Sequence, residues 1–241
     1  MIRAATAGDE ERIDAFLTPH TAYAMFLRSN LAKHGLDERE HPHGTRFFLE
    51  EEGGDGAGAV GLAYELTPEQ TVSGGLEMEY ARTTDSFSAD LETLTLAVPL
   101  EYVRDTRDSK LNPTSGTRLS LLVEPTYEIN GGATFVKLRA EASAYRALDA
   151  DKRFVVAGRV AAGSIYGADL ALIPANRRFY AGGGGSVRGY GYQDIGPVNA
   201  AGQPTGGRSV LEASGEVRIQ VTETIGIVPF VDAGLVSASQ S

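Results

Sequence analysis

One stretch of the sequence decides the fold class: Phe135-Val136-Lys137-Leu138-Arg139-Ala140-Glu141-Ala142-Ser143-Ala144. From Val136 onward every even-numbered residue is apolar, and nearly every odd-numbered residue is polar. Because successive side chains of a β-strand point to opposite faces, this period of two predicts a strand with one apolar face and one charged face.

The same alternation recurs along the chain beyond about residue 67. It is clear over 94–102, 117–128 and 211–221, fainter over 72–82 and 153–165, and a last candidate strand covers 225–237. Strands of this length exceed the roughly 5–6 residues usual in soluble sheets and match the roughly 9–11 residues that cross a bilayer obliquely. We therefore predict a mainly β fold: a partial antiparallel transmembrane β-barrel of about 7–8 long strands, apolar toward lipid and charged toward a watery lumen. The alternative is a soluble β-sandwich or lipocalin-like barrel, in which the two faces exchange places.

The predicted connections differ in length. Those at 130–132, 149–152 and 222–223 are tight, whereas 105–116 and 166–207 are long. Short periplasmic turns alternating with longer external loops are typical of outer-membrane barrels, so this asymmetry favours the membrane interpretation.

Composition excludes several classes of protein. The 241 residues carry a formal net charge of −10, which disfavours nucleic-acid binding because that function needs a basic face. Without cysteine there is no disulfide, thiolate metal site or cysteine nucleophile. No apolar run approaches the length of a membrane helix, and we identify no secretory signal at the N-terminus.

Residues 1–66 have a different character, and we predict a small α+β segment there. Helices are expected over about 6–17 and 22–31, followed by a hairpin of strands 46–50 and 57–64. All four histidines lie in this segment, so no Ser-His-Asp arrangement with the strands is predicted. His41 and His43 are expected in a solvated loop rather than in a metal site.

Two pairs of carboxylates stand out in the strands, Glu77 with Glu79 and Glu212 with Glu216. The alternation places them on the lumen face, where we expect a solvated lining rather than a glycosidase dyad. We accordingly predict no catalytic residue, no metal and no cofactor, and a protein that is not an enzyme.

The longest connection contains an Arg- and Gly-rich run, Arg177-Arg178-Phe179-Tyr180-Ala181-Gly182-Gly183-Gly184-Gly185-Ser186-Val187-Arg188-Gly189-Tyr190-Gly191-Tyr192. Loops this long are usually functional or disordered. The run fails the phosphate-loop pattern because Tyr190 stands where lysine is required, and it matches only the opening of an RNA-binding motif. If the loop folds into a barrel lumen, the charge of Arg188 needs a carboxylate partner, and Asp232 is the natural candidate. A flexible, solvated loop is the alternative.

Three motifs closely resemble those of the TamA/BamA-type superfamily of POTRA-bearing outer-membrane insertases, the surface antigen barrels, with the TamA branch closest. The first is Tyr102-Val103-Arg104-Asp105-Thr106-Arg107-Asp108 followed by Asn112 to Gly116. The second runs from Arg178 to Tyr190 and continues to Gly196-Pro197, and the third is Phe230-Val231-Asp232-Ala233-Gly234. The resemblance covers about residues 67–241.

The resemblance implies a loop tucked inside a sixteen-stranded barrel, where Arg188 meets Asp232. Its lumen-loop motif maps onto Gly185, Ser186, Val187, Arg188, Gly189 and Tyr190, and its strand motif onto Phe230 and Gly234. It further implies non-enzymatic assembly or translocation of proteins in the bacterial outer membrane. The implied partners are outer-membrane lipid, unfolded outer-membrane or autotransporter clients and a periplasm-spanning partner protein, with no nucleic acid. We expect the chain to cover only part of such a barrel, without its seam, POTRA domains or signal peptide.

A weaker resemblance concerns the N-terminus, where residues 2–9, 25–31 and the Gly-rich hairpin look like the opening of a GNAT-type acetyltransferase. The acetyl-CoA loop of that superfamily does not appear, so we expect no acetyltransferase activity. A GNAT-like fragment and a soluble β-domain of unknown binding role are the alternative functions. We divide the chain into 1–66, an α+β segment resembling an incomplete GNAT N-terminus, and 67–241, a partial outer-membrane assembly-factor barrel; a fused or truncated reading frame is our hypothesis for this break.

Overall fold

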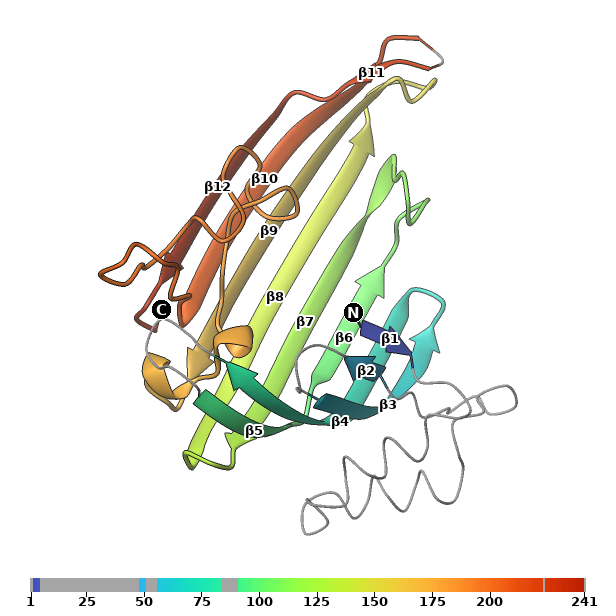
Figure 1. The fold of residues 1–241 in the computed structure, drawn as a ribbon. Coiled ribbons are helices and arrows are strands. Elements are labelled where there is room, and N and C mark those ends of the chain that lie inside the picture. The colour runs from blue at the N-terminus through green and yellow to red at the C-terminus, as the bar shows by residue number, and fades with distance from the viewer. Residues whose placement is uncertain (1, 5–47, 51–55, 84–90, 223, 241) are drawn as a thin grey trace.

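The structure is a computed structural model that describes residues 2–4, 48–50, 56–83, 91–222 and 224–240 (Figure 1). The helices expected over 6–17 and 22–31, and all four histidines, lie outside these residues. The strands are β1 (Ile2–Ala4), β2 (Phe48–Glu50), β3 (Gly56–Thr67), β4 (Gln70–Thr83), β5 (Leu91–Ala97), β6 (Leu100–Asp105), β7 (Ser115–Glu128), β8 (Ala133–Ala147), β9 (Phe154–Tyr166), β10 (Ser209–Gln220), β11 (Gly226–Ile227) and β12 (Phe230–Ser237). Two short 3₁₀ helices, η2 (Leu170–Leu172) and η3 (Ala175–Arg177), lie in the connection between β9 and β10.

Ten of the described strands form one antiparallel sheet, in which β5 and β6 both lie between β4 and β7, and β11 and β12 both lie beside β10. Two long strands are interrupted by proline. β5 and β6 both pair with β4 and are separated by Val98-Pro99, and β11 and β12 both pair with β10 and are separated by Val228-Pro229. Proline has no N–H to donate to a ladder, so each strand breaks there without leaving the sheet. When each interrupted pair is counted as one, the described residues form eight long strands, which confirms the predicted fold class.

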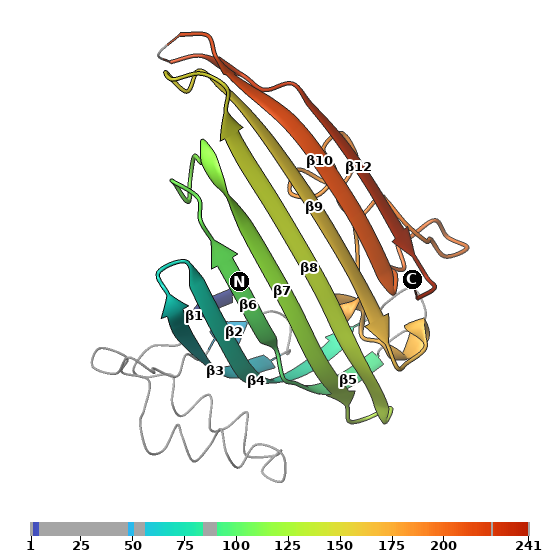
Figure 2. The ribbon, with the colours of Figure 1, turned by 180° about the vertical axis from the view of Figure 1, so that it is seen from behind.

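The two faces of the sheet are inverted relative to a soluble protein. On β7, Leu121 and Val123 are about two-fifths exposed, whereas Glu124, the residue after Val123, is 7% exposed. The same contrast holds on β10, where Leu211 is exposed and Glu212 is buried. Apolar side chains that face outward and carboxylates that face inward are the arrangement of a barrel wall in lipid, and the soluble alternative is not supported. Figure 2 shows the outward face as bare strands.

Strand β3 differs from its predicted pairing. The sequence suggested a hairpin of 46–50 with 57–64, but β2 pairs with β1 in a separate two-stranded sheet, and β3 pairs with β4 along nearly its whole length. Only Pro68 and Glu69 separate β3 from β4, so the pairing across this tight turn is the most local one available. β3 therefore belongs to the ten-stranded sheet although it precedes the boundary expected at residue 66.

The two long connections lie at opposite ends of the sheet, contrary to the predicted asymmetry. Because the sheet is a meander, connections alternate between its ends. The connection after β6 shares its end with the tight turn after β8, and the connection after β9 shares its end with the tight turn after β7. Connection length alone therefore does not distinguish the two ends.

Among the described residues, no helix has the length and hydrophobicity needed to cross a membrane. The apolar core lies instead where the β9–β10 connection meets the inner face of the sheet. Phe135 and Ile165 from the strands pack there with Ile173 and Phe179 from the connection, and all four side chains are buried.

Candidate lumen-loop site

The connection of residues 167–208, here called the glycine loop, lies against the inner face of the sheet. In Figure 1 it passes in front of β9, β10 and β12, and in Figure 2 it lies behind these strands. Two of its residues, Ala181 and Val187, are buried at 1% exposure. Backbone bonds between Phe179 and Gly207, 2.9 and 2.8 Å long, close the base of the loop.

The structure brings Arg188 of the loop and Asp232 of β12 together. The Arg188 guanidinium donates from Nε to Asp232 Oδ2 at 2.7 Å and from Nη2 to Oδ1 at 2.8 Å, and the Arg188 backbone N–H donates to Oδ2 at 2.9 Å. The Asp232 side chain is 1% exposed. A two-pronged guanidinium–carboxylate contact fixes both orientation and distance, so it holds the loop at a defined position on β12.

Further groups on the inner face complete the environment of Arg188. Nη1 donates to Glu216 Oε2 at 2.8 Å, Nη2 donates to Ser214 Oγ at 2.9 Å, and the guanidinium lies 3.8 Å from the centre of the Phe230 ring. The hydrogen bonds to Asp232 and Glu216 raise the pKa of Arg188 above its ordinary value. Each donor nitrogen of the side chain thus has an acceptor, and Phe230 covers one face of the cation.

Gly234 gives the loop room to approach β12. A Cβ atom at Gly234 would lie 2.6 Å from Val187 Cγ2, which is too close for any side chain without movement of Val187. Gly189, directly after the arginine, has a φ of +92°, a left-handed conformation that favours glycine. Val187 therefore packs on bare backbone at Gly234, and the chain turns away after Arg188.

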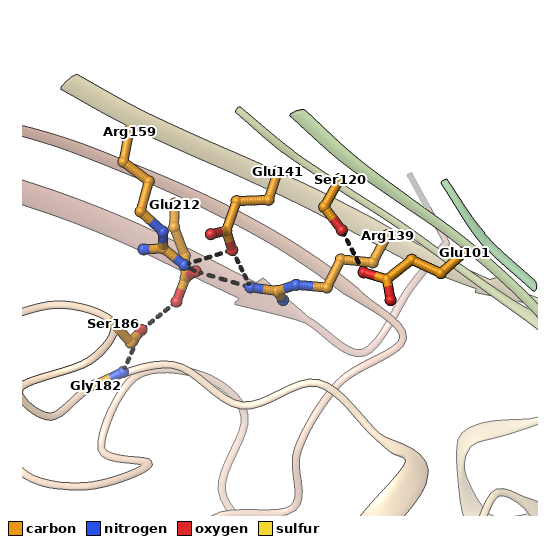
Figure 3. A network of polar contacts seen from close by, with 8 residues as sticks. All are labelled: Glu101, Ser120, Arg139, Glu141, Arg159, Gly182, Ser186 and Glu212. Atoms are coloured by element: carbon orange, nitrogen blue, oxygen red, sulfur yellow. Dashed lines mark hydrogen bonds and ion pairs between the residues drawn. The ribbon is translucent and has the colours of Figure 1, made fainter. Parts of the chain in front are cut away.

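Ser186 joins the loop to a second polar network on the inner face (Figure 3). Its hydroxyl donates to Glu212 and accepts the Gly182 N–H at 3.1 Å. Glu212 also accepts from Arg159 at 3.0 Å and from Arg139 at 3.4 Å, and both arginines contact Glu141. Ser120 and Glu101 form a separate pair at 2.6 Å in the same view.

The two remaining residues of the lumen-loop motif, Gly185 and Tyr190, are exposed to solvent. Gly185 would have no atom within 4 Å of a Cβ, and the Tyr190 side chain is exposed. Neither residue makes a close contact that explains its identity in the motif.

The carboxylates predicted to be a solvated lining are paired instead. Glu216 contacts Arg188 and Arg218, and Glu212 is buried beneath Ser186. Glu77 and Glu79 both contact Arg177 of the loop. The expectation of solvated lining is therefore wrong, because alternation locates a carboxylate on the lumen face but does not indicate that a loop will cover it.

The earlier strand-and-turn motif forms a compact connection at the other end of the sheet. Asp108 accepts hydrogen bonds from the Thr114 N–H at 2.8 Å and the Ser115 N–H at 3.1 Å. Gly116 has a φ of +98°, and a Cβ there would lie 2.3 Å from the Thr106 carbonyl oxygen. These contacts explain why an acid and a glycine stand at those positions. Among the described residues, no three or more histidine, aspartate or glutamate side chains are arranged so that they could hold a metal ion.

Comparisons with known proteins agree with this architecture. The family model of the Omp85 superfamily domain matches residues 39–241. The outer membrane protein assembly factor BamA of Nitratidesulfovibrio vulgaris is 32% identical over 148 residues, which is 60% of this chain and 18% of that protein. The crystal structure of BamA from Haemophilus ducreyi lacking POTRA domains 1–3 superposes with a TM-score of 0.64 at 14% identity, covering 83% of this chain and 48% of that one. The chain thus spans about half of the solved relative and under a fifth of the curated one. With most of its length matched by the family model, the chain belongs to the Omp85 superfamily.

Proposed function

We propose that this chain supplies part of the barrel of an outer-membrane protein assembly factor, in which the glycine loop acts from within the lumen. The protein catalyses no covalent reaction. It receives unfolded outer-membrane or autotransporter proteins as clients, works in the bacterial outer membrane and contacts lipid through its apolar face. A periplasm-spanning partner, and membership of the TamA branch in particular, belong to the same proposal.

The contact between Arg188 and Asp232 carries this proposal. A simple barrel wall needs no loop inside it, and a buried carboxylate is costly unless it is paired. Here the loop places three donor nitrogens on one buried carboxylate, and Gly234 is small enough to admit Val187 beside it. The Nitratidesulfovibrio vulgaris relative is an outer membrane protein assembly factor, which supports the functional class. In the part of the chain that the structure describes, no comparable feature favours an acetyltransferase.

The test is Arg188→Ala in the intact protein, with two quantities measured in the same cells: the amount of heat-modifiable barrel in the outer membrane and the rate of client assembly. We expect client assembly to fall more than barrel abundance. Arg153→Ala is the matched control, because Arg153 is exposed at the far end of the sheet and its side chain donates to the Gln220 carbonyl at 3.4 Å. An equal loss of barrel and assembly would make the contact merely structural and contradict the proposal.

A further inference from the structure

We propose that Arg177 is a positioning residue that ties the base of the glycine loop to β4 and β7, so that the loop is held at two separate places. The first anchor, Arg188, attaches the loop to β10 and β12 near one edge of the sheet. The second attaches it toward the other edge, where β4 lies next to β3. Arg177 lies outside the motif described above. Its effect on client assembly, though not its structural role, rests on the proposed function.

The contacts of Arg177 reach two strands that are distant from it in sequence. Its Nη1 donates to Glu124 Oε1 of β7 at 3.1 Å, and its Nη2 donates to Glu79 Oε2 of β4 at 2.7 Å and also to Glu77. The neighbouring Asn176 amide donates to Glu79 as well. The Arg177 side chain is 8% exposed, so this is a nearly buried bridge.

The charge balance makes the bridge depend on the arginine. Three carboxylates converge on one guanidinium. Lys137 stands opposite Glu124 in the β7–β8 register and lies 5.0 Å from the Phe179 ring, so a second cation borders the cluster. Without Arg177, three carboxylates would face one another with a single lysine nearby, and like charges that close repel. A planar guanidinium has enough donors to reach acceptors on two strands at once, which a lysine does not match.

The bridge lies where the sheet bends. Glu77 and Glu79 follow Gly75 and Leu76, which face the Val98-Pro99 interruption, and the Gly75 N–H donates to the Pro99 carbonyl at 2.9 Å. In Figure 1, β5 and the adjoining end of β4 turn across the lower end of the sheet toward the loop. Arg177 therefore joins the bent end of the sheet to the base of the loop.

Two anchors predict two separable effects. The base of the loop is reported by the Phe179 N–H, which donates to Gly207, and the tip by the Ile195 N–H, which donates to Ala181 at 3.1 Å. Hydrogen–deuterium exchange of the intact protein in membranes measures the exchange rates of both amides. Arg177→Gln is expected to speed exchange at Phe179 on the order of tenfold and to leave Ile195 nearly unchanged, whereas Arg188→Gln is expected to do the reverse.

Two further variants keep this test decisive. Arg177→Gln combined with Glu77→Gln and Glu79→Gln removes the bridge to β4 and keeps Glu124 opposite Lys137, so no charge of the cluster is left unpaired, and it is expected to speed exchange at Phe179 even if the single variant does not fold. Arg177→Lys keeps the charge and is expected to give intermediate exchange. Arg153→Gln is the control.

The outcomes separate this proposal from the proposed function. Unchanged exchange at Phe179 in the triple variant would overturn the anchor. Faster exchange accompanied by an equal loss of barrel and of client assembly would overturn the positioning role. Faster exchange with undiminished client assembly would leave the anchor standing and contradict the proposed function. We expect faster exchange, unchanged barrel abundance and slower assembly per folded barrel, partly restored by Arg177→Lys.

Discussion

Arg188 and Asp232 are joined by three nitrogen–oxygen contacts of 2.7–2.9 Å, one of which comes from the arginine's own backbone. The backbone contact fixes the loop main chain as well as the side chain. A substitution at either residue is therefore expected to move the loop and not only to remove a charge.

Asp232→Asn tests the charge in this contact. Asparagine nearly preserves the shape but offers one acceptor oxygen where the carboxylate offers two, so at least one of the three hydrogen bonds from Arg188 is lost. We expect the free energy of unfolding to fall by about 2 kcal/mol, a common value for a hydrogen bond to a charged group. Denaturant titration of the refolded protein in detergent measures it.

The control for that variant is Glu69→Gln. Glu69 pairs with Arg104 at 3.9 Å, and both side chains are more than half exposed, so this surface pair is expected to contribute under about 1 kcal/mol. Equal losses in the two variants would show that Asp232 behaves as an ordinary surface acid.

Gly234→Ala tests the close approach of the loop to β12. The new methyl group would clash with Val187 Cγ2, and overpacking of this kind costs about 1–3 kcal/mol. Val187→Ala removes the clashing methyl groups. We therefore expect Gly234→Ala to lower the stability less in the Val187→Ala background than in the wild type. Unfolding midpoints of the wild type, the two single variants and the double variant provide the cycle. Strictly additive losses would contradict the contact.

Ala140→Arg tests which face of the sheet meets lipid. Ala140 is exposed near the middle of β8, where an arginine facing the bilayer centre costs about 2–4 kcal/mol. Ser143→Arg places the same side chain on the lumen face of the same strand, in register with Arg159, and is expected to cost much less. Refolding yields into lipid vesicles compare them. If Ser143→Arg lowered the refolding yield more than Ala140→Arg does, the result would favour the soluble interpretation.

Asp108 gives the connection between β6 and β7 a pH dependence. The Thr114 hydroxyl and the backbone N–H groups of Thr114 and Ser115 hold the pKa of Asp108 well below its usual range. Because its pKa in the unfolded chain, about 3.9, is the higher value, the stabilisation is fully present above about pH 4 and is lost as the pH falls through the folded value. Exchange at the Thr114 amide is expected to show an acid-labile protection that Asp108→Asn abolishes. Identical acid profiles for the two proteins would contradict this.

Much of the fold follows from local sequence. Alternation in Phe135 to Ala144 sets which side chains face lipid, because a strand has only two faces, and the structure retains that division. The strand breaks at Pro99 and Pro229 were not predicted, since alternation continues on both sides of each proline. The prediction that the long connections lie at one end of the sheet and the tight turns at the other was also wrong, because the length of a connection does not indicate the end at which it lies.

The candidate site was only partly accessible from the sequence. Arg188 and Asp232 attract attention because a lone acid among apolar neighbours must find a cation. Arg177 gave no such signal: its partners Glu77 and Glu124 lie 100 and 53 residues away in sequence. Only the path of the loop across the inner face brings these residues together.

The placement of the loop against β12 is tested most directly by a disulfide between Val187→Cys and Gly234→Cys. A Cβ at Gly234 would lie 2.6 Å from Val187 Cγ2, which is one carbon–carbon bond beyond the Val187 Cβ, so the two β-carbons lie at most about 4 Å apart, within disulfide range. Tyr192→Cys with Gly234→Cys is the control, because Tyr192 is exposed. In outer membranes under mild oxidation, we predict near-complete cross-linking of the first pair and little of the second. Absent cross-linking of the first pair in a folded barrel, or equal cross-linking of both pairs, would contradict a loop held in the lumen.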